Sequence, residues 1–472
     1  MLTIKKIFSD YTNLFDKSIQ INGWVQTTRS QKDMTFIKLN DGTNPEGIQI
    51  IVEGNDNKYS IGISLQVDGK LVKSPAQGQL FELQAETITI LGDCDPTIYP
   101  LSKGKMSLDY LRNYQHLRPR TNTFGCAFRI KSSITQATHR FFEEEDYLHL
   151  DPNILTINEC EGGAGVFQVT EKDISIPSKL ALKKIEVKQE NKELKNEKKV
   201  TENYDWSQDH FGKPVYLTVS SQLSLEPLAC SLRNVYTTNK SFRSEHSSTH
   251  KHLSEFTHLE IETCFLTLDE LMDIGEKYIK YVAKYLLDKR MSDIASLSAF
   301  ISKGLKERIE TIVSATFHRV KYADAIKIAQ DKGKKVNYGE DLSSEIETCL
   351  TEHFNGPVFV YHWPIAIKSF YMKRDLEDST ICHNFDLLMP YRVGELIGGS
   401  MREDSYDKLI EMMKMKGVSE EPMKFYSDLR KFGSVPHGGF GLGLDRMSML
   451  FTGLESIKDT VPFPVYFQSC EY

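Results

Sequence analysis

The sequence predicts a two-domain protein in which a small antiparallel β-barrel precedes a larger domain of mixed helices and strands. Three observations support this fold class. The chain has 472 residues, more than one hydrophobic core usually organises. The first hundred residues alternate apolar and polar positions in short runs, which is the period of strands. From Ala127 onward the apolar residues follow a helical period instead.

Composition limits the class of protein. With 40% hydrophobic and 26% charged residues, the chain is neither disordered nor fibrous in type. No run of eighteen apolar residues occurs and the start MLTIKKIFSD lacks the apolar core of a secretory signal, so we expect a soluble, cytoplasmic protein with no membrane partner. The eight cysteines are scattered singly, without the spacing of a zinc site or a disulfide framework. A net charge of −7 disfavours indiscriminate nucleic-acid binding but allows a local basic surface.

The barrel is predicted within residues 1–100. Its strands correspond to the runs INGWVQTTRS, MTFIKLNDG, IQIIVEG and LFELQAETITILG, which turn residues separate. Pro96 and Pro100 break this pattern, and the basic, aromatic stretch DYLRNYQHLRPRT follows. We therefore expect a connector over 101–126 and a second domain over 127–472.

A long amphipathic helix opens the second domain. Ile130, Ile134, Ala137 and Phe141 lie on one helical stripe, and Pro152 stands beyond the end of the helix. Such a stripe most often packs on the core of its own domain. The stretch LDELMDIGEKYIKYVAKYLLDKR predicts another amphipathic helix.

A charged insertion covers about 183–202. It reads KKIEVKQENKELKNEKKVTE and contains no aromatic residue. Mixed charges of this kind usually form a solvated surface, so we expect a helical or mobile insertion without a chemical role.

A polar hairpin is the first candidate for chemistry. In SFRSEHSSTHKHLSEFTHLEIE, Arg243 and Glu245 end one expected strand, while His252, Glu255 and Phe256 begin the next. Residues near such a turn face a common cleft, where arginine can bind a phosphate and phenylalanine can stack on a base. By chemistry alone, an exposed charged hairpin remains the alternative.

A glycine-rich segment near the C-terminus is the second candidate. PHGGFGLGLDRMSML brings Gly438, Gly439, Gly441 and Gly443 before Arg446 at the start of a helix. Glycines allow close approach of a ligand to the backbone, and a helix start favours anions. Tight packing between strand and helix would explain the glycines equally well.

These segments together resemble a known family. FRSE with HLSEF looks like motif 2 of the class II aminoacyl-tRNA synthetases, GFGLGLDR like motif 3, and FRIKSSITQATHRFFEEEDYLHLDP like motif 1. GWVQTTRSQKDMTFIKLNDG resembles the OB-fold anticodon-binding domain of the aspartyl, asparaginyl and lysyl branch. The resemblance implies an α+β catalytic domain built on an antiparallel sheet flanked by helices, with an N-terminal OB-fold barrel. It also implies a homodimer formed through the motif 1 helix.

Two segments resemble the asparaginyl form of this branch. In LTVSSQLSLEPLA, Leu225 stands where aspartyl enzymes have a lysine, and Glu226 follows. A carboxylate can accept a hydrogen bond from a carboxamide and repel aspartate. NFDLLMPYRVGELIGGSMRED would supply Arg402 to the substrate side-chain carbonyl, although an ordinary ion pair with Glu226 is the alternative. The resemblance also places Glu161, from ECEGGAGVF, and Gln222 near the substrate ammonium.

The resemblance assigns further residues to ATP and magnesium. Asp386 and Glu395 would hold Mg²⁺, whose preferred ligands are hard oxygens. Gly398 departs from the pattern, because aspartyl enzymes often have a serine ligand there. The ATP-binding residues would be Arg243, Glu245, His252, Phe256, Gly443 and Arg446, with Arg243 and Arg446 as the catalytic pair.

In the barrel, the resemblance implies that Phe36 stacks on an anticodon base while Arg29 and Gln49 contact base edges. We therefore expect a ligase that activates L-asparagine with ATP and transfers it to tRNA(Asn). Three alternatives remain: an aspartyl enzyme of relaxed specificity, an ammonia-dependent asparagine synthetase, and a catalytically inactive tRNA-binding protein. Glu226 opposes the first alternative and the barrel opposes the second. The third is opposed by the presence of Arg243, His252 and Arg446.

Overall fold

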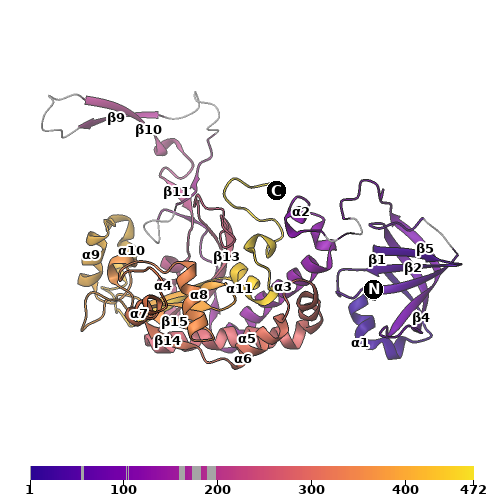
Figure 1. Ribbon diagram of the computed structural model, residues 1–472. Helices are drawn as coiled ribbons and strands as arrows, with labels where there is room; N and C mark the ends of the chain where they lie inside the picture. Colours follow the sequence, from indigo (N-terminus) through magenta and orange to yellow (C-terminus); the bar gives the residue numbers. More distant parts are fainter. Residues whose placement is uncertain are drawn as a thin grey trace.

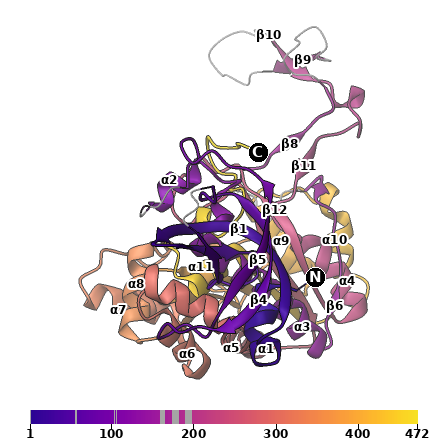
Figure 2. The ribbon, with the colours of Figure 1, turned by 90° about the vertical axis from the view of Figure 1, so that its right-hand side faces the viewer.

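The computed structural model contains a barrel and a larger α+β domain, which lie at opposite ends of the molecule (Figure 1). The second view looks along the long direction from the barrel side (Figure 2). The structure describes residues 2–54, 58–101, 104, 106–158, 165–172, 182–188 and 198–472.

The N-terminal domain is a closed five-stranded barrel, as the alternating runs predicted. Its strands follow the order β1-β2-β3-β5-β4, and every neighbouring pair is antiparallel except β3 with β5. A helix that the strand pattern did not predict, α1 (Ile4–Leu14), starts at the N-cap Thr3 and buries Ile4 and Ile7 in the barrel core. The strands are β1 (Ser18–Gln31), β2 (Met34–Asn40), β3 (Ile48–Glu53), β4 (Ser64–Lys73) and β5 (Phe81–Gly92).

Short helices lead from the barrel into the long predicted helix. The short helices are α2 (Leu108–Arg112) and η1 (Arg118–Arg120), and the long helix is α3 (Asn122–Glu144). Arg118 is buried, and its Nη2 donates to the carbonyl oxygen of Val461 at 2.6 Å, which ties the connector to the C-terminal segment. The expected stripe of α3, from Ile130 to Phe141, is buried in the core of the larger domain.

An eight-stranded sheet forms the centre of the larger domain. Its six inner strands are antiparallel, whereas the edge strands β14 and β6 pair in parallel with their neighbours. In spatial order the strands are β14 (His318–Lys321), β15 (Val358–Tyr361), β16 (Asn384–Met389), β17 (Gly394–Met401), β18 (His437–Gly443), β13 (Glu255–Cys264), β12 (Asn234–Phe242) and β6 (Leu148–His149).

Helices cover one face of this sheet. The largest hydrophobic cluster joins α3, α5 (Leu268–Phe300), α6 (Leu305–Ser314) and α11 (Leu444–Thr452) to inward side chains of the inner strands. Figure 1 shows α5 and α6 along the lower side of the domain. A capping box between Thr267 and Glu270 starts α5. The predicted fold class, an antiparallel sheet flanked by helices, is confirmed.

The remaining elements surround the opposite face and its edges. They are β7 (Leu155–Thr156), β8 (Gln168–Val169), β11 (Val215–Leu217), η3 (Trp206–Gln208), α4 (Gln222–Leu232), α7 (Tyr322–Asp331), α8 (Ser344–His353), η4 (Ile365–Ile367), α9 (Tyr406–Met415), η5 (Glu421–Met423), α10 (Lys424–Asp428) and η6 (Ile457–Asp459). Among the described helices, none is long and apolar enough to cross a membrane.

The charged insertion differs from its prediction. Strand β9 (Leu182–Lys188) pairs antiparallel with β10 (Lys198–Tyr204), and the pair projects from the larger domain (Figures 1 and 2). The expectation of a helix is therefore wrong for the described parts of this segment. Its sequence KKIEVK alternates charged and β-branched residues, a pattern that favours a strand.

Candidate active site

The sheet face away from the core helices carries the candidate site. Along β13, Leu259 and Ile261 point into the core, so the alternation of a strand puts His258, Glu260 and Glu262 on the other face. All three polar residues are at least nine-tenths buried. Buried acids on one strand indicate a site rather than a solvated surface.

Glycines of the neighbouring strands leave space beside these acids. Gly441 lies opposite Glu260 in β18, and Gly398 lies opposite Gly441 in β17. A Cβ on Gly441 would stand 2.6 Å from His258 Nε2, which is too close for any side chain. The glycine-rich segment therefore forms the floor of the site, where backbone rather than side chains faces a ligand.

The predicted hairpin brings its cations to one end of this face. Arg243 donates its backbone N–H to Ser254 O at 2.9 Å, and its guanidinium carbon lies 5.5 Å from the Phe256 ring centre. His252 Nε2 stands 3.9 Å from Glu245 Oε2. Burial lowers the pKa of His252 and the nearby arginines lower it further, while Glu245 opposes them. Together these residues line one end of this sheet face, and this region is called the cleft from here on.

Arg446 joins the same cleft from the glycine-rich segment. Strand β18 ends at Gly443, the N-cap residue of α11, and Arg446 lies in the first turn of that helix. Its Nη1 donates to Glu395 O at 2.6 Å and its Nη2 to Lys251 O at 3.4 Å. Because Lys251 directly precedes His252, this contact with Lys251 brings Arg446 to the hairpin.

Asp386 and Glu395 come from the adjacent strands β16 and β17, as expected. A Cβ on Gly398 would lie 3.6 Å from Asp386 Oδ1 and 3.2 Å from Glu395 Oε1, so both carboxylates converge over this glycine. Burial raises the pKa of Asp386 to about 7; Lys368, whose Nζ is 2.9 Å away, opposes this shift, and Glu395 adds to it. Two hard oxygen donors beside a residue without a side chain fit a Mg²⁺ ion.

Glu226 occupies the centre of a buried polar network. Its Oε1 accepts from Gln222 Nε2 at 3.0 Å and Tyr426 Oη at 2.7 Å. Its Oε2 accepts from Arg430 Nη2 at 2.8 Å and lies 3.1 Å from His437 Nε2. Burial alone would raise the pKa of Glu226, but Arg430 and His437 outweigh it and keep the carboxyl ionised. These four partners occupy the usual acceptor positions of the carboxylate.

Arg402 lies beside this network but binds a different acid. Its Nε is 3.8 Å from Glu226 Oε1. Its Nε and Nη2 donate to the two oxygens of Glu262 at 3.0 and 2.8 Å, and its Nη1 donates to Ser400 at 2.7 Å. The arginine is therefore held mainly in a fork with Glu262, and the ion pair with Glu226 is present as a longer contact.

Sequence reasoning missed several residues of this face. Glu262 had a usable signal, because HLEIETC alternates polar and apolar positions along one strand. His437 directly precedes the glycine run and could have been grouped with it. Tyr426 and Arg430 had no such signal, since Tyr426 lies in the short helix α10 and Arg430 two residues beyond its end, in sequence of unremarkable composition. The expected substrate residue Glu161 lies outside the described residues.

The three expected base-contacting residues of the barrel lie on neighbouring strands. Arg29 pairs with Phe36 across β1 and β2, and its guanidinium carbon stands 4.9 Å from the Phe36 ring centre. Gln49 of β3 pairs with Lys38, which is two residues beyond Phe36 and on the same face. The surface is open, and it combines a stacking ring with cations and an amide.

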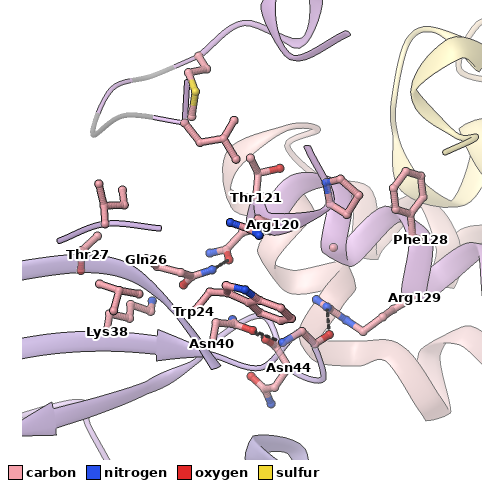
Figure 3. A pocket seen from close by; sticks show the side chains of 18 of the residues that line it. Trp24, Gln26, Thr27, Lys38, Asn40, Asn44, Arg120, Thr121, Phe128 and Arg129 are labelled. Atoms are coloured by element: carbon pink, nitrogen blue, oxygen red, sulfur yellow. Dashed lines mark hydrogen bonds between the residues drawn. The ribbon is translucent and has the colours of Figure 1, made fainter. Parts of the chain in front are cut away.

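A cavity of about 1040 Å³ lies between the barrel and α3 (Figure 3). Trp24 lines the cavity, and the guanidinium carbon of Arg120 lies 5.4 Å from the centre of the Trp24 ring. Gln26 of the barrel donates its Nε2–H to Asn122 Oδ1 of α3 at 3.1 Å. Arg129 donates to Gly42 O at 2.7 Å. Among the described residues, none of the predicted ATP, amino-acid or metal ligands lines this cavity. Its contacts hold the barrel against the larger domain.

Comparison with known families agrees with this geometry. A family model described as "tRNA synthetases class II (D, K and N)" matches residues 107–466, and one described as an OB-fold nucleic acid binding domain matches residues 19–91. The barrel, the antiparallel sheet and the cleft thus define a class II tRNA synthetase.

Relatives identify the family more closely. The chain is 40% identical to the asparagine–tRNA ligase of Protochlamydia amoebophila over 96% of this chain and 95% of that protein. It is 42% identical to the ligase of Treponema denticola, over 95% of each. The asparaginyl-tRNA synthetase of Pyrococcus horikoshii, solved with asparaginyl-adenylate, superposes with a TM-score of 0.82 at 29% identity over 97% of both chains. The chain belongs to the asparagine–tRNA ligase family.

Proposed function

We propose that this protein activates L-asparagine with ATP to asparaginyl-adenylate and transfers the asparaginyl group to the 3′-terminal adenosine of tRNA(Asn). The carboxylate of Glu226 and the guanidinium of Arg402, both buried and 3.8 Å apart, are the observation that carries this proposal. Asparagine and aspartate are nearly isosteric, so only polar groups can separate them. A fixed carboxylate beside a fixed guanidinium suits a side chain with one NH₂ donor and one carbonyl acceptor.

Recognition of the carboxamide requires an exchange of partners at Glu226. Its four acceptor positions are taken by Gln222, Tyr426, Arg430 and His437. Gln222 is the most exposed of the four, at 9%, and its amide is neutral. We infer that the substrate NH₂ replaces Gln222 on Oε1 and that the released Gln222 turns to the substrate ammonium, while Glu161 supplies a second contact there.

Activation needs positioned charges rather than a protein nucleophile. The asparagine carboxylate attacks the α-phosphorus of ATP, and pyrophosphate leaves. In this proposal Arg243 bridges the α-phosphate and the carboxylate, and His252 and Arg446 hold the γ-phosphate end. Adenine stacks between Phe256 and Arg446. Glu245 and Gly443 complete the ATP site, where preorganised cations stabilise the developing negative charge.

Asp386 and Glu395 are the proposed ligands of Mg²⁺. The ion would neutralise phosphate charge when bound. Lys368, which pairs with Asp386 at 2.9 Å, supplies a positive charge to the same acid from the protein itself. The absence of a side chain on Gly398 leaves the space between the two carboxylates open to the ion or its waters.

The barrel is the proposed reader of the anticodon, with Phe36 stacking on a base and Arg29 and Gln49 on base edges. It stands at the far end of the molecule from the cleft (Figure 1), which suits a partner that reaches both ends. We also propose that the protein works in the cytoplasm as a homodimer formed through α3, because isologous pairs are the commonest homo-oligomers.

The proposal is tested by charging tRNA. Purified protein is incubated with ATP, magnesium, labelled asparagine and a tRNA pool, with labelled aspartate in a parallel reaction. We expect the label from asparagine to become attached to tRNA. Mild base should release it, because the bond is an ester. Free labelled asparagine formed from aspartate and ammonia would instead identify an asparagine synthetase, and charging with aspartate would identify an aspartyl enzyme.

A further inference from the structure

Two histidines and an aspartate meet at one end of the central sheet, away from the ATP cleft. His362 directly follows β15, and His383 directly precedes β16. Asp375 belongs to the loop between these strands. One ligand atom from each of the three residues lies within 4.8 Å of the other two, and each residue is half-buried. The proposed reaction uses none of them.

The backbone around this group is fixed by the sheet. The His362 N–H donates to Asn384 O at 3.1 Å, and the His383 N–H donates to Lys373 O at 2.8 Å. His362 also has a φ of 59°, in the left-handed region, where non-glycine residues are uncommon but histidine is among the enriched ones. Such conformations persist where the surrounding structure imposes them, and they gather at functional sites. The two imidazoles are thereby held side by side, with ring centres 5.1 Å apart.

The carboxylate is oriented toward the imidazoles. Asp375 Oδ1 accepts the backbone N–H groups of Glu377 and Asp378 at 2.8 and 2.9 Å. Its Oδ2 lies 2.9 Å from His383 Nε2. The N–H of Asp378 and the other hydrogen bonds lower the pKa of Asp375, and burial lowers the pKa of His362. An ionised carboxylate and a neutral imidazole are the forms that bind metals.

We propose that His362, His383 and Asp375 bind a divalent transition-metal ion of the zinc type. Two imidazoles and one carboxylate suit Zn²⁺ or Co²⁺, whereas Mg²⁺ prefers oxygen ligands. Metal–ligand distances of about 2.0–2.2 Å put tetrahedral ligand atoms roughly 3.3 Å apart. Small side-chain rotations therefore close the group around an ion. Three protein ligands leave a fourth position for water or another group.

The ion would connect three segments at this end of the central sheet. It would join the end of β15, the loop that carries Asp375, and the start of β16, whose Asp386 lies three residues beyond His383. The turn hydrogen bonds to Asp375 act as supporting contacts that keep a ligand oriented. The proposal is independent of the aminoacylation reaction, because it concerns residues outside the cleft.

Zinc binding to the full-length protein tests this site. Zn²⁺ is titrated by equilibrium dialysis in excess Mg²⁺, which occupies Asp386 and Glu395, and X-ray absorption identifies the ligands. We expect one tightly bound Zn²⁺ per chain with two imidazole ligands. His383→Gln and Asp375→Asn should each weaken binding at least about a hundredfold, whereas His353→Gln, at an exposed histidine of α8, should not.

Several results would overturn the site. They are the absence of stoichiometric Zn²⁺ in wild type, an oxygen-only ligand shell, and equal affinity in wild type and folded His383→Gln. Circular dichroism shows whether the variants fold. If a variant does not fold, the ligand shell measured on the wild-type protein still shows whether Zn²⁺ is bound by the two histidines and the aspartate.

Discussion

The cleft of the larger domain and the outer face of the barrel use arginine in opposite ways. In the buried network around Glu226, on the cleft side of the molecule, Arg402 and Arg430 are hydrogen-bonded to Glu262 and Glu226. On the barrel, Arg29 is exposed and lies over Phe36. Breaking a buried charge pair typically costs about 3–5 kcal/mol, whereas a cation–π contact at an exposed site is worth about 0.5–1 kcal/mol. The cleft is therefore fixed before its ligands arrive, and the barrel face is open for a partner to complete.

The largest expected effect comes from removing a cation of the cleft. We predict that Arg446→Ala or Arg243→Ala lowers asparagine-dependent ATP–pyrophosphate exchange by on the order of 10²–10³-fold or more, because each removes charge stabilisation from a preorganised site. The fold and tRNA binding should be nearly unchanged. Arg319→Ala is the matched control, since Arg319 pairs with acids of α5 from the edge strand β14. Near-normal exchange in either cleft variant would refute the assigned roles.

Removing the stacking ring of the barrel should have a smaller and separable effect. Phe36→Ala is expected to weaken tRNA binding by about 1–3 kcal/mol, the usual contribution of one base stacked on an aromatic ring. Asparagine-dependent exchange without tRNA should stay at the wild-type rate, because the barrel lies far from the cleft. Phe300→Ala, at a phenylalanine that is 78% exposed in the other domain, is the control. If exchange falls together with charging, the two regions are not independent.

The smallest expected effect is the pH dependence of metal binding at Asp386 and Glu395. Because the pKa of Asp386 is raised to about 7, the carboxyl is protonated below that pH and a cation must displace the proton. Above that pH the carboxyl is already deprotonated, and no proton has to be displaced. We predict that Mn²⁺ binds about tenfold more tightly at pH 8 than at pH 6 in the presence of a non-hydrolysable ATP analogue.

Electron paramagnetic resonance measures free Mn²⁺ in this titration. Asp386→Asn should lose most of the pH dependence, and any slope that remains belongs to the nucleotide. The same affinity at both pH values in wild type would show that the buried acid does not hold the ion.

Local patterns predicted the parts of the fold that depend on neighbouring residues. Strand alternation gave the barrel, and the stripe from Ile130 to Phe141 gave α3. The hairpin around Arg243 and the glycine run before Arg446 meet in one cleft because β12, β13 and β18 are adjacent. The spacing of residues within each of these segments is therefore sufficient to predict its local structure.

The surroundings of Glu226 could not be predicted in the same way. Arg430 and Tyr426 lie 204 and 200 residues away in sequence, yet they bind its two oxygens. Nothing in their local sequence distinguishes them from surface residues. The helix α1 was also missed, since its burial of Ile4 and Ile7 depends on the closed barrel beneath it. Contacts between distant segments were thus the missing information.

Amino-acid specificity tests the account most directly. ATP–pyrophosphate exchange is measured with asparagine and with aspartate on wild type and Glu226→Gln. Wild type should favour asparagine by roughly 10⁴-fold or more, as buried polar mismatches do. The variant should activate aspartate better relative to asparagine, because the repelling charge is gone while Arg402 and Arg430 remain positive. Wild type that activates both amino acids equally, or an unchanged ratio in the folded variant, would contradict the proposed pocket.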